Sequence, residues 1–305
     1  MSDIIMCQES LGLLEAGRNP GTFCLPFVKM HGCGNDYIYV DAFSLDIQPD
    51  ALLKILYDRN LCHRHTGIGG DGFVLILPSQ SADAKMRMFN PDGSESGMCG
   101  NAIRCVGKYL YESKRVAKTH MVIETLSGDK RLDLVEENEI ITAVRVDMGQ
   151  AKLTPEEIPV NLVGEAIVGR GVNITSQPYE ITCVNMGNPH TVIFHEDIDH
   201  FDLHTIAPLF EHADIFPERT SIEVAQMVSR NNIRMRVWER GTGETMACGT
   251  GACAVAVAAV LMGYCDRDAD ICVQLKGGDL IVKYTDETVY MTGECVRVFE
   301  GIVKI

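Results

Sequence analysis

The amino-acid sequence predicts an α/β protein made of two related halves, each with many short β-strands and few helices. Three observations lead to this prediction. A segment rich in glycine and cysteine recurs along the chain, short β-type runs occur in both halves, and the stretch GACAVAVAAVLMG is apolar on every side. A helix that is apolar all round must be enclosed, and a curved sheet can enclose it.

The recurring segment is the strongest sign of duplication. MRMFNPDGSESGMCGNAIRCV and MRVWERGTGETMACGTGACAV align without a gap, and each contains an alternating strand, a turn, and a cysteine that opens a helical stretch. These cysteines are Cys99 and Cys248, 149 residues apart. A second echo, GCGNDYIYV and NMGNPHTVIF, places Asn35 and Asn188 before β-type runs. Two repeated segments that occur in the same order indicate that a unit of roughly 150 residues was duplicated. The alternative is a chance similarity between glycine-rich loops.

The expected elements follow from local patterns. In the first half we expect strands at Phe27–Lys29, Tyr37–Asp41, Phe73–Leu77, Lys85–Phe89 and Met121–Thr125. In the second half we expect them at Thr182–Met186, Thr191–Phe194, Met235–Trp238, Ile271–Leu275 and Leu280–Tyr284. Helices are expected at Pro49–Asp58 and after each repeated cysteine. We expect an N-terminal extension at 1–26, a first domain from 27 to 147, and a second domain from 148 to 293.

Composition excludes several classes of protein. The net charge of −15 without a basic stripe argues against a nucleic-acid partner. The first residues do not resemble a targeting signal, and the longest apolar run is too short to span a bilayer. The twelve cysteines form no C-x-x-C pair, which disfavours zinc ribbons and disulfide redox sites and favours a cytoplasmic protein with buried thiols. Cys62, His63 and His65 lack the further ligands of a metal site, so no metal is expected.

A cysteine at a helix start suits proton transfer at carbon. Free backbone N–H groups and the positive end of the helix dipole stabilise a thiolate there. The N–H groups after each cysteine can also bind a carboxylate, and glycine at that position allows close approach. Duplicated halves commonly face each other, which would set Cys99 opposite Cys248. Two such thiols favour stereoinversion, in which one removes an α-proton and the other returns a proton to the opposite face. The structural alternative is that both cysteines are buried thiols at helix starts with no role in catalysis.

At these residues the sequence resembles the diaminopimelate epimerase family, whose members are cofactor-independent amino-acid epimerases and racemases with two cysteines. The resemblance runs from about Phe27 to Ile305. It is carried by KMHGCGNDYIYVD, RHTGIGGDG, FNPDGSESGMCGNAIRC, NMGNPHTVIF, FPERTSIEV and WERGTGETMACGTGACA. It implies two pseudo-symmetric domains, each a mixed β-barrel-like sheet around a central helix, with residues 294–305 returning to the first domain. It also implies an amino-acid substrate, no cofactor, and a homodimer.

The resemblance implies roles for individual residues. Cys99 matches the proton donor in the LL-to-meso direction, and Cys248 matches the acceptor. His190 and Glu239 match supporting polar residues near the thiols. The positions that match substrate-binding residues are Asn35, Gly72, Asn90, Gly100, Asn101, Asn188, Ser221, Glu239, Arg240, Gly249 and Thr250. Each also has a structural reading: the asparagines beside Gly or Pro can serve turn geometry, His190 can satisfy a buried backbone group, and Arg240 can form a surface ion pair.

Two departures from the family pattern leave the substrate open. Ser221 stands where members usually have Asn, and Gly72 where many have Gln. The first hypothesis is interconversion of LL- and meso-diaminopimelate in lysine and cell-wall precursor synthesis. The second keeps the chemistry with another amino acid, such as histidine. The third is a non-catalytic, thiol-rich binding protein. A pyridoxal enzyme is disfavoured, because no lysine lies in a recognisable Schiff-base setting.

Overall fold

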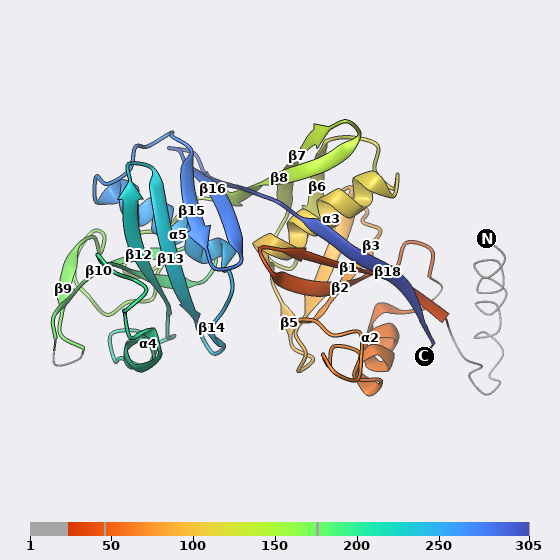
Figure 1. The fold of residues 1–305 in the computed structure, drawn as a ribbon, viewed down its shortest axis with the longest axis horizontal. Coiled ribbons are helices and arrows are strands. Elements are labelled where there is room, and N and C mark those ends of the chain that lie inside the picture. The colour runs from red at the N-terminus through yellow and green to blue at the C-terminus, as the bar shows by residue number, and fades with distance from the viewer. Residues whose placement is uncertain (1–23, 46, 175–176, 305) are drawn as a thin grey trace. The chain divides into compact units, whose positions relative to one another are not determined.

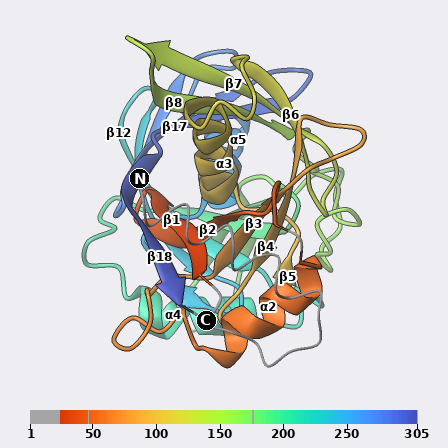
Figure 2. The same cartoon turned by 90° about the vertical axis from the view of Figure 1, so that its right-hand side faces the viewer.

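The computed structural model describes residues 24–45, 47–174 and 177–304, which form a mixed α/β fold (Figures 1 and 2). The chain divides into two compact units. The first unit contains the described residues up to Gly32, Asp36–Asp129, and those from Cys295 onward, whereas the second contains Cys33–Asn35 and Lys130–Glu294. The division therefore falls earlier in the chain than the boundary expected after residue 147. Of the expected extension, residues 1–23 lie outside the described residues.

In its described residues, the first unit is a mixed sheet with two helices. Its strands are β1 (Cys24–Gly32), β2 (Asn35–Asp41), β3 (Phe73–Leu77), β4 (Ala84–Phe89), β5 (Glu95–Ser96), β6 (His120–Glu124) and β18 (Val296–Lys304). Its helices are α2 (Pro49–Asp58) and α3 (Gly100–Glu112). β2 pairs parallel with β3, β3 antiparallel with β4, and β4 parallel with β6. β18 pairs antiparallel with β1, so Val296–Lys304 groups with this unit.

The second unit has a longer sheet. Its strands are β7 (Lys130–Glu137), β8 (Ile140–Gly149), β9 (Arg170–Val172), β10 (Tyr179–Asn185), β11 (Pro189–Phe194), β12 (Ser221–Ser229), β13 (Asn232–Glu239), β14 (Gly243–Glu244), β15 (Ile271–Leu275), β16 (Gly278–Tyr284) and β17 (Val289–Gly293). Its helices are α4 (Leu203–Glu211) and α5 (Gly249–Leu261). The hairpin of β7 and β8 belongs here because β8 pairs with β17.

The strand registers of the two units repeat each other. Phe73 pairs with Phe89 across β3 and β4, and Ile222 pairs with Trp238 across β12 and β13, each 149 residues further along. The parallel pairing of β2 with β3 recurs as that of β11 with β12, and the pairing of β4 with β6 recurs as that of β13 with β15. The predicted internal repeat is therefore present in the topology of the chain.

An arginine and a glutamate that recur in both copies of the repeat form the same ion pair in each unit. Arg87 donates hydrogen bonds to both carboxylate oxygens of Glu95, at 2.9 Å each. Arg236 does the same to Glu244, at 2.9 and 3.1 Å. In both units this bidentate ion pair ties the short strand of the turn to the strand before it, and the turn leads directly to the repeated cysteine. Two parallel N–H···O bonds fix direction as well as distance, so the pair positions the turn.

The apolar helix of the second unit is enclosed, as predicted. Every residue from Gly251 to Ala259 of α5 is buried. The helix packs against β10, β11, β12, β15, β16 and β17, so strands cover it on several sides. Because alanine and valine have no polar side-chain atoms, their burial gains hydrophobic free energy without leaving a hydrogen-bonding group unsatisfied.

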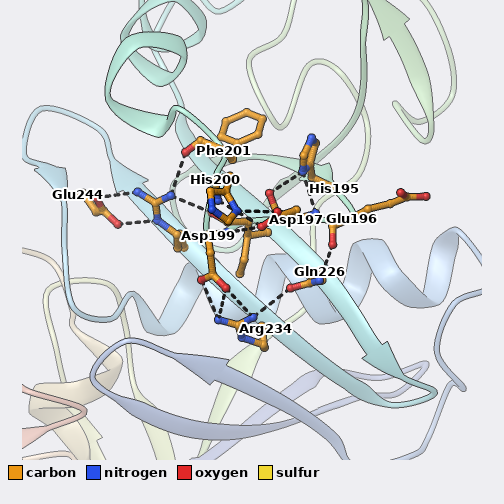
Figure 3. Close-up of polar contacts among 11 residues, drawn as sticks. His195, Glu196, Asp197, Asp199, His200, Phe201, Gln226, Arg234 and Glu244 are labelled. Atoms are coloured by element: carbon orange, nitrogen blue, oxygen red, sulfur yellow. Dashed lines mark hydrogen bonds and ion pairs between the residues drawn. The ribbon is translucent and has the colours of Figure 1, made fainter.

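An arginine network secures the segment between β11 and α4 (Figure 3). Arg234 contacts both carboxylate oxygens of Asp199 and the side-chain oxygen of Gln226. Arg236 also donates to the backbone oxygens of Ile198 and Phe201. The segment is thereby held against β12 and β13, the strands on which Ser221 and Glu239 lie.

Candidate active site

Cys99 lies at the N-cap of α3, with extended backbone angles of φ −130° and ψ 123°. Gly100 and Asn101 form the first turn of the helix, and both are buried. Beneath this turn lies the fully buried guanidinium of Arg104, which donates to the Gly100 oxygen at 3.1 Å and to Asn101 Oδ1 at 3.0 Å. The prediction that this cysteine opens a helix is correct. Arg104 fixes the direction of the Asn101 side chain and adds a positive charge to the cationic end of the helix.

Cys248 occupies the equivalent position at the N-cap of α5, with φ −124° and ψ 115°. Its Sγ accepts a hydrogen bond from the Gly251 N–H at 3.4 Å and lies 3.4 Å from Thr250 Oγ1. The residue is 6% exposed. The thiol therefore sits among the free N–H groups of a helix start, which is the setting that the sequence predicts.

Burial and nearby carboxylates keep the Cys248 thiol protonated. Burial raises the pKa of Cys248 well above its ordinary value, and the negative charges of Glu239 and Glu223 raise it further. The hydroxyl of Thr250 and the N–H of Gly251 favour the thiolate and oppose this rise. Since burial is the largest cause, the thiol is the form present at neutral pH.

Glu239 lies at the end of β13, next to Cys248. Thr245 Oγ1 donates to Glu239 Oε1 at 2.5 Å. Burial raises the pKa of the Glu239 carboxyl, while hydrogen bonds from Thr245 and Cys248 lower it by a smaller amount. A carboxylate that touches the thiol and resists ionisation can exchange a proton with it.

His190 on β11 is held between two partners. Its Nδ1 lies 2.7 Å from Glu223 Oε1, and its Nε2 lies 3.1 Å from Asn188 Oδ1. His190 and Glu223 are both fully buried. His190 lowers the pKa of the Glu239 carboxyl, while the charge of Glu223 raises the pKa of both Glu239 and Cys248, so these side chains form one electrostatic group in the second unit.

Ser221 and Arg240 meet where β12 begins and β13 ends. The Arg240 backbone N–H donates to Ser221 Oγ at 3.1 Å, and the Arg240 guanidinium donates to the Glu218 backbone oxygen at 2.8 Å. Ser221 is 1% exposed. Arg240 thus forms a side chain-to-backbone contact rather than the ion pair with Glu239 that the sequence left open, and Ser221 secures the turn that carries both residues.

The remaining predicted residues lie on turns or at the start of a strand or helix. Asn188 is in the turn before β11, and Asn90 follows β4, where its Nδ2 donates to Ser94 Oγ at 2.9 Å. Asn35 begins β2 but is grouped by its contacts with the second unit. Gly249 and Thr250 open α5. The described structure thus brings His190, Asn188, Glu239 and Cys248 into one unit, and Cys99, Gly100, Asn101, Asn90 and Gly72 into the other.

Gly72 precedes β3 with φ +153°, and an added Cβ would lie 2.0 Å from the Phe89 backbone oxygen. Backbone geometry therefore requires glycine here. We expect Gly72→Ala to lower the free energy of unfolding by about 2 to 4 kcal/mol. Gly93→Ala is the control, because Gly93 has φ +92° with nothing within 4 Å of an added Cβ; its cost is about 1 kcal/mol. Urea denaturation measures both, and equal losses would contradict the clash at Gly72.

Sequence reasoning missed Glu223 and Thr245. Glu223 lies on β12 within SIEVA, where its neighbours on the strand are buried and apolar. A carboxylate inside such a run is a signal for a buried polar contact, because an unpaired charge there is costly. Thr245 stands in the glycine-rich turn, and only the fold brings its hydroxyl to Glu239.

A sequence model of the family described as diaminopimelate epimerase matches residues 27–154 and 182–298. A protein named diaminopimelate epimerase from Methanococcus maripaludis (strain S2 / LL) is 50% identical over 284 residues, covering 92% of this chain and 100% of its own length. Another of that name, from Desulfovibrio desulfuricans, is 51% identical and covers 91% of this chain and 97% of its own.

Solved structures share the fold at low sequence identity. A hydroxyproline epimerase from Agrobacterium vitis matches with a TM-score of 0.66 at 14% identity, covering 92% of this chain and 93% of its own. A PhzF-family phenazine biosynthesis protein from Bacillus anthracis also has a TM-score of 0.66, at 17% identity, with 92% and 99% coverage. Within the described residues, no helix is both long and apolar enough to cross a membrane.

Proposed function

The chain belongs to the diaminopimelate epimerase family of isomerases, and from this premise we propose that it interconverts LL- and meso-diaminopimelate through two thiols, Cys99 and Cys248, without pyridoxal phosphate. The observation that carries the proposal is the matched position of the two cysteines. Each lies at the N-cap of the helix that follows the repeated strand and turn. A single such thiol serves many reactions, whereas a duplicated pair suits a reaction that must treat both faces of one carbon.

The proposed chemistry moves one proton off the substrate and another onto it. A thiolate removes the α-proton and becomes a thiol, leaving a carbanion whose charge is shared with the α-carboxylate. The other cysteine donates its thiol proton to the opposite face and becomes a thiolate. The substrate gains and loses one proton, so the reaction needs no external oxidant or reductant. In the LL-to-meso direction we propose that Cys248 accepts the α-proton and Cys99 donates. Burial and Glu239 raise the Cys248 pKa, so Cys248 first passes its own proton to a base, for which the adjacent Glu239 carboxylate is placed.

The helix starts supply the electrostatic part of catalysis. Backbone N–H groups of Gly100, Asn101, Gly249 and Thr250 are proposed to hold the α-carboxylate, where they stabilise charge that develops in the transition state. Arg240, Asn90 and Asn188 are proposed to hold the distal carboxylate, for which the guanidinium offers a bidentate geometry. Asn35, Gly72 and Ser221 complete the proposed substrate contacts.

A second candidate substrate remains because of Ser221. The buried Ser221 hydroxyl accepts from the Arg240 N–H, which leaves its own proton free to donate to a carboxylate. A shorter residue at this position also leaves space for a different side chain, such as that of histidine. We favour diaminopimelate because Arg240, Asn90 and Asn188 are all present.

We expect Ser221→Asn to keep or modestly improve turnover of LL-diaminopimelate, since Asn still offers an oxygen to the Arg240 N–H and adds a donor for the distal carboxylate. If the native substrate has no distal carboxylate, the larger side chain instead crowds it or leaves a buried amide unpaired, which costs about 1 to 3 kcal/mol. The measurement is kcat/KM for LL-diaminopimelate and for histidine in both proteins. A loss for diaminopimelate together with wild-type turnover of histidine would reverse the choice of substrate.

The proposed function itself is tested by hydrogen exchange in deuterated water. LL-Diaminopimelate incubated with the protein is expected to acquire deuterium at one α-carbon and to yield the meso form, as followed by NMR and chiral chromatography. A panel of other amino acids, histidine included, is run beside it. Exchange with another amino acid and not with diaminopimelate would replace the substrate and keep the thiol chemistry.

We further propose that the reaction supplies meso-diaminopimelate for lysine and peptidoglycan precursor synthesis in the cytoplasm. The protein is proposed to act as a homodimer, which sedimentation velocity on the purified chain can test.

A further inference from the structure

Among the many positions at which the duplicated halves differ, three lie together in the second unit, next to the helix start that carries Cys248. Because the strand registers repeat, paired residues on the repeated strands of the second unit have counterparts in the first. Val74 pairs with Met88 in the first unit, and Glu223 pairs with Val237, 149 residues further along, in the second. By the same registers, Glu223, His190 and Gly251 of the second unit correspond to Val74, Tyr37 and Ala102 of the first. The second unit therefore has a carboxylate and an imidazole where the first has apolar packing and a tyrosine.

Gly251 provides the space for the carboxylate. A Cβ added at this residue would lie 2.7 Å from Glu223 Oε1 and 3.3 Å from its Cδ. Glu223 Oε1 is also 2.7 Å from His190 Nδ1. The carboxylate is thus confined between the first turn of α5 and the imidazole ring. In the first unit the two counterparts, Ala102 and Val74, are apolar and fully buried, whereas a methyl group at Gly251 would press against Glu223.

Packing alone does not account for Glu223. The side chains of Glu223 and His190 are both 0% exposed. Within the described residues, Glu223 Oε2 is buried and makes no hydrogen bond. A buried carboxylate with an unsatisfied oxygen is costly, whereas valine fills the equivalent place in the first unit at no such cost. The presence of Glu223 is therefore better explained by its hydrogen bond to His190 than by packing.

We propose that Glu223 is a positioning residue for His190: its carboxylate accepts the Nδ1 proton, fixes the ring, and leaves the Nε2 lone pair to accept a hydrogen bond from the amide NH2 of Asn188, whose side chain is then turned so that Nδ2 rather than Oδ1 faces the ring. The charged and titratable groups around this ring are Glu223 on β12, Glu239 on β13 and Cys248 at the start of α5, with Cys183 on β10 beside Glu223. A fixed imidazole with a defined proton position can take part in proton transfer without first reorienting.

The ring itself provides the first test, which needs no substrate. In protein labelled with ¹⁵N-histidine, long-range ¹H–¹⁵N NMR is expected to show Nδ1 of His190 protonated, with the signals assigned by loss in His190→Asn. Glu223→Val combined with Gly251→Ala copies the packing of the first unit and removes the acceptor. The ring is then expected to change to the Nε2–H form or to average between forms. Glu223→Gln, which keeps an acceptor oxygen, is expected to retain the Nδ1–H form.

Two further proteins separate positioning from general damage. Glu211→Gln also removes a buried carboxylate, one that holds Trp238 Nε1 and the Gly241 N–H. It is expected to lower the melting temperature and leave the His190 signals in place. If the double variant does not fold, Glu223→Ala supplies the same comparison. Unchanged His190 signals in a folded variant that lacks the acceptor would overturn the inference.

The consequence for turnover rests on the proposed function. With LL-diaminopimelate, the double variant is expected to lose about a hundredfold in kcat, with KM near that of the wild type, and Glu223→Gln is expected to lose less. Full kcat in the double variant, despite an altered ring, would overturn the positioning role. Absence of wild-type turnover with this substrate would instead overturn the proposed function, and the NMR result would stand.

Discussion

Cys99→Ala and Cys248→Ala are each expected to lower kcat for epimerisation at least about a thousandfold, because each face of the α-carbon needs its own proton carrier. Both thiols lie at helix N-caps, so alanine removes the proton carrier and leaves the backbone N–H groups that are proposed to bind the substrate. Binding of LL-diaminopimelate, measured by calorimetry, is expected to change little. Chiral analysis of the product gives the rate.

The matched control for these substitutions is Cys272→Ala. Cys272 lies on β15 and pairs with Asn232, at the opposite end of β13 from Glu239, so its loss is expected to leave kcat unchanged. Serine at either active position is expected to retain binding and to permit elimination from substrates with a good leaving group, since one base then suffices. A Cys248→Ala protein that inverts substrate at a rate near the wild type would refute the two-base mechanism.

Glu239→Gln is expected to lower kcat by about a hundredfold or more while making the Cys248 thiol more acidic. Glu239 contacts this thiol, and its negative charge is one cause of the raised Cys248 pKa. The amide removes that charge, so Cys248 ionises at a lower pH, but it cannot accept the thiol's proton. Peptide-resolved alkylation by iodoacetamide as a function of pH measures the first effect, and epimerisation measures the second.

The pH profile gives Glu239 a separate signature. Burial raises the pKa of its carboxyl, so the carboxylate is lost on acidification at a higher pH than for an ordinary glutamate. If the carboxylate is the active form, kcat falls on the acid side through this raised pKa, and that limb disappears in Glu239→Gln. The exposed Glu196→Gln serves as control. An unchanged acid limb in Glu239→Gln would assign it to another group.

The parts of the fold that were predictable are those with local signals. The strands around Met86 and Met235 alternate, and the cysteines that follow them are preceded by turns and followed by helical stretches, so the repeat and both helix starts are evident from the sequence alone. The strand β18 also has a period-two pattern in places, but its pairing with β1 depends on residues more than 250 positions away, which no local pattern encodes.

The missed elements show where local reasoning ends. The helix α4 contains Pro208, a residue that normally interrupts a helix, so its sequence does not favour one. Asp202 compensates by capping the helix, since its side chain accepts from the Thr205 N–H. In the site, Cys99 and Cys248 were identifiable from their spacing in the sequence. The contact of Glu223 with His190 was not, because it forms only when β11 pairs with β12.

The pairing of β1 with β18 has a consequence for how the protein is made. Residues that complete the first unit's sheet leave the ribosome after nearly all of the second unit, Lys130–Glu294, has been synthesised. The usual order of folding during translation, in which the N-terminal domain matures first, is therefore reversed for these two strands. Until Val296–Lys304 emerges, β1 presents an open strand edge to the nascent chain's surroundings, and such edges are prone to improper pairing. Translation of Val296–Lys304 thus decides when this edge of β1 is protected from aggregation.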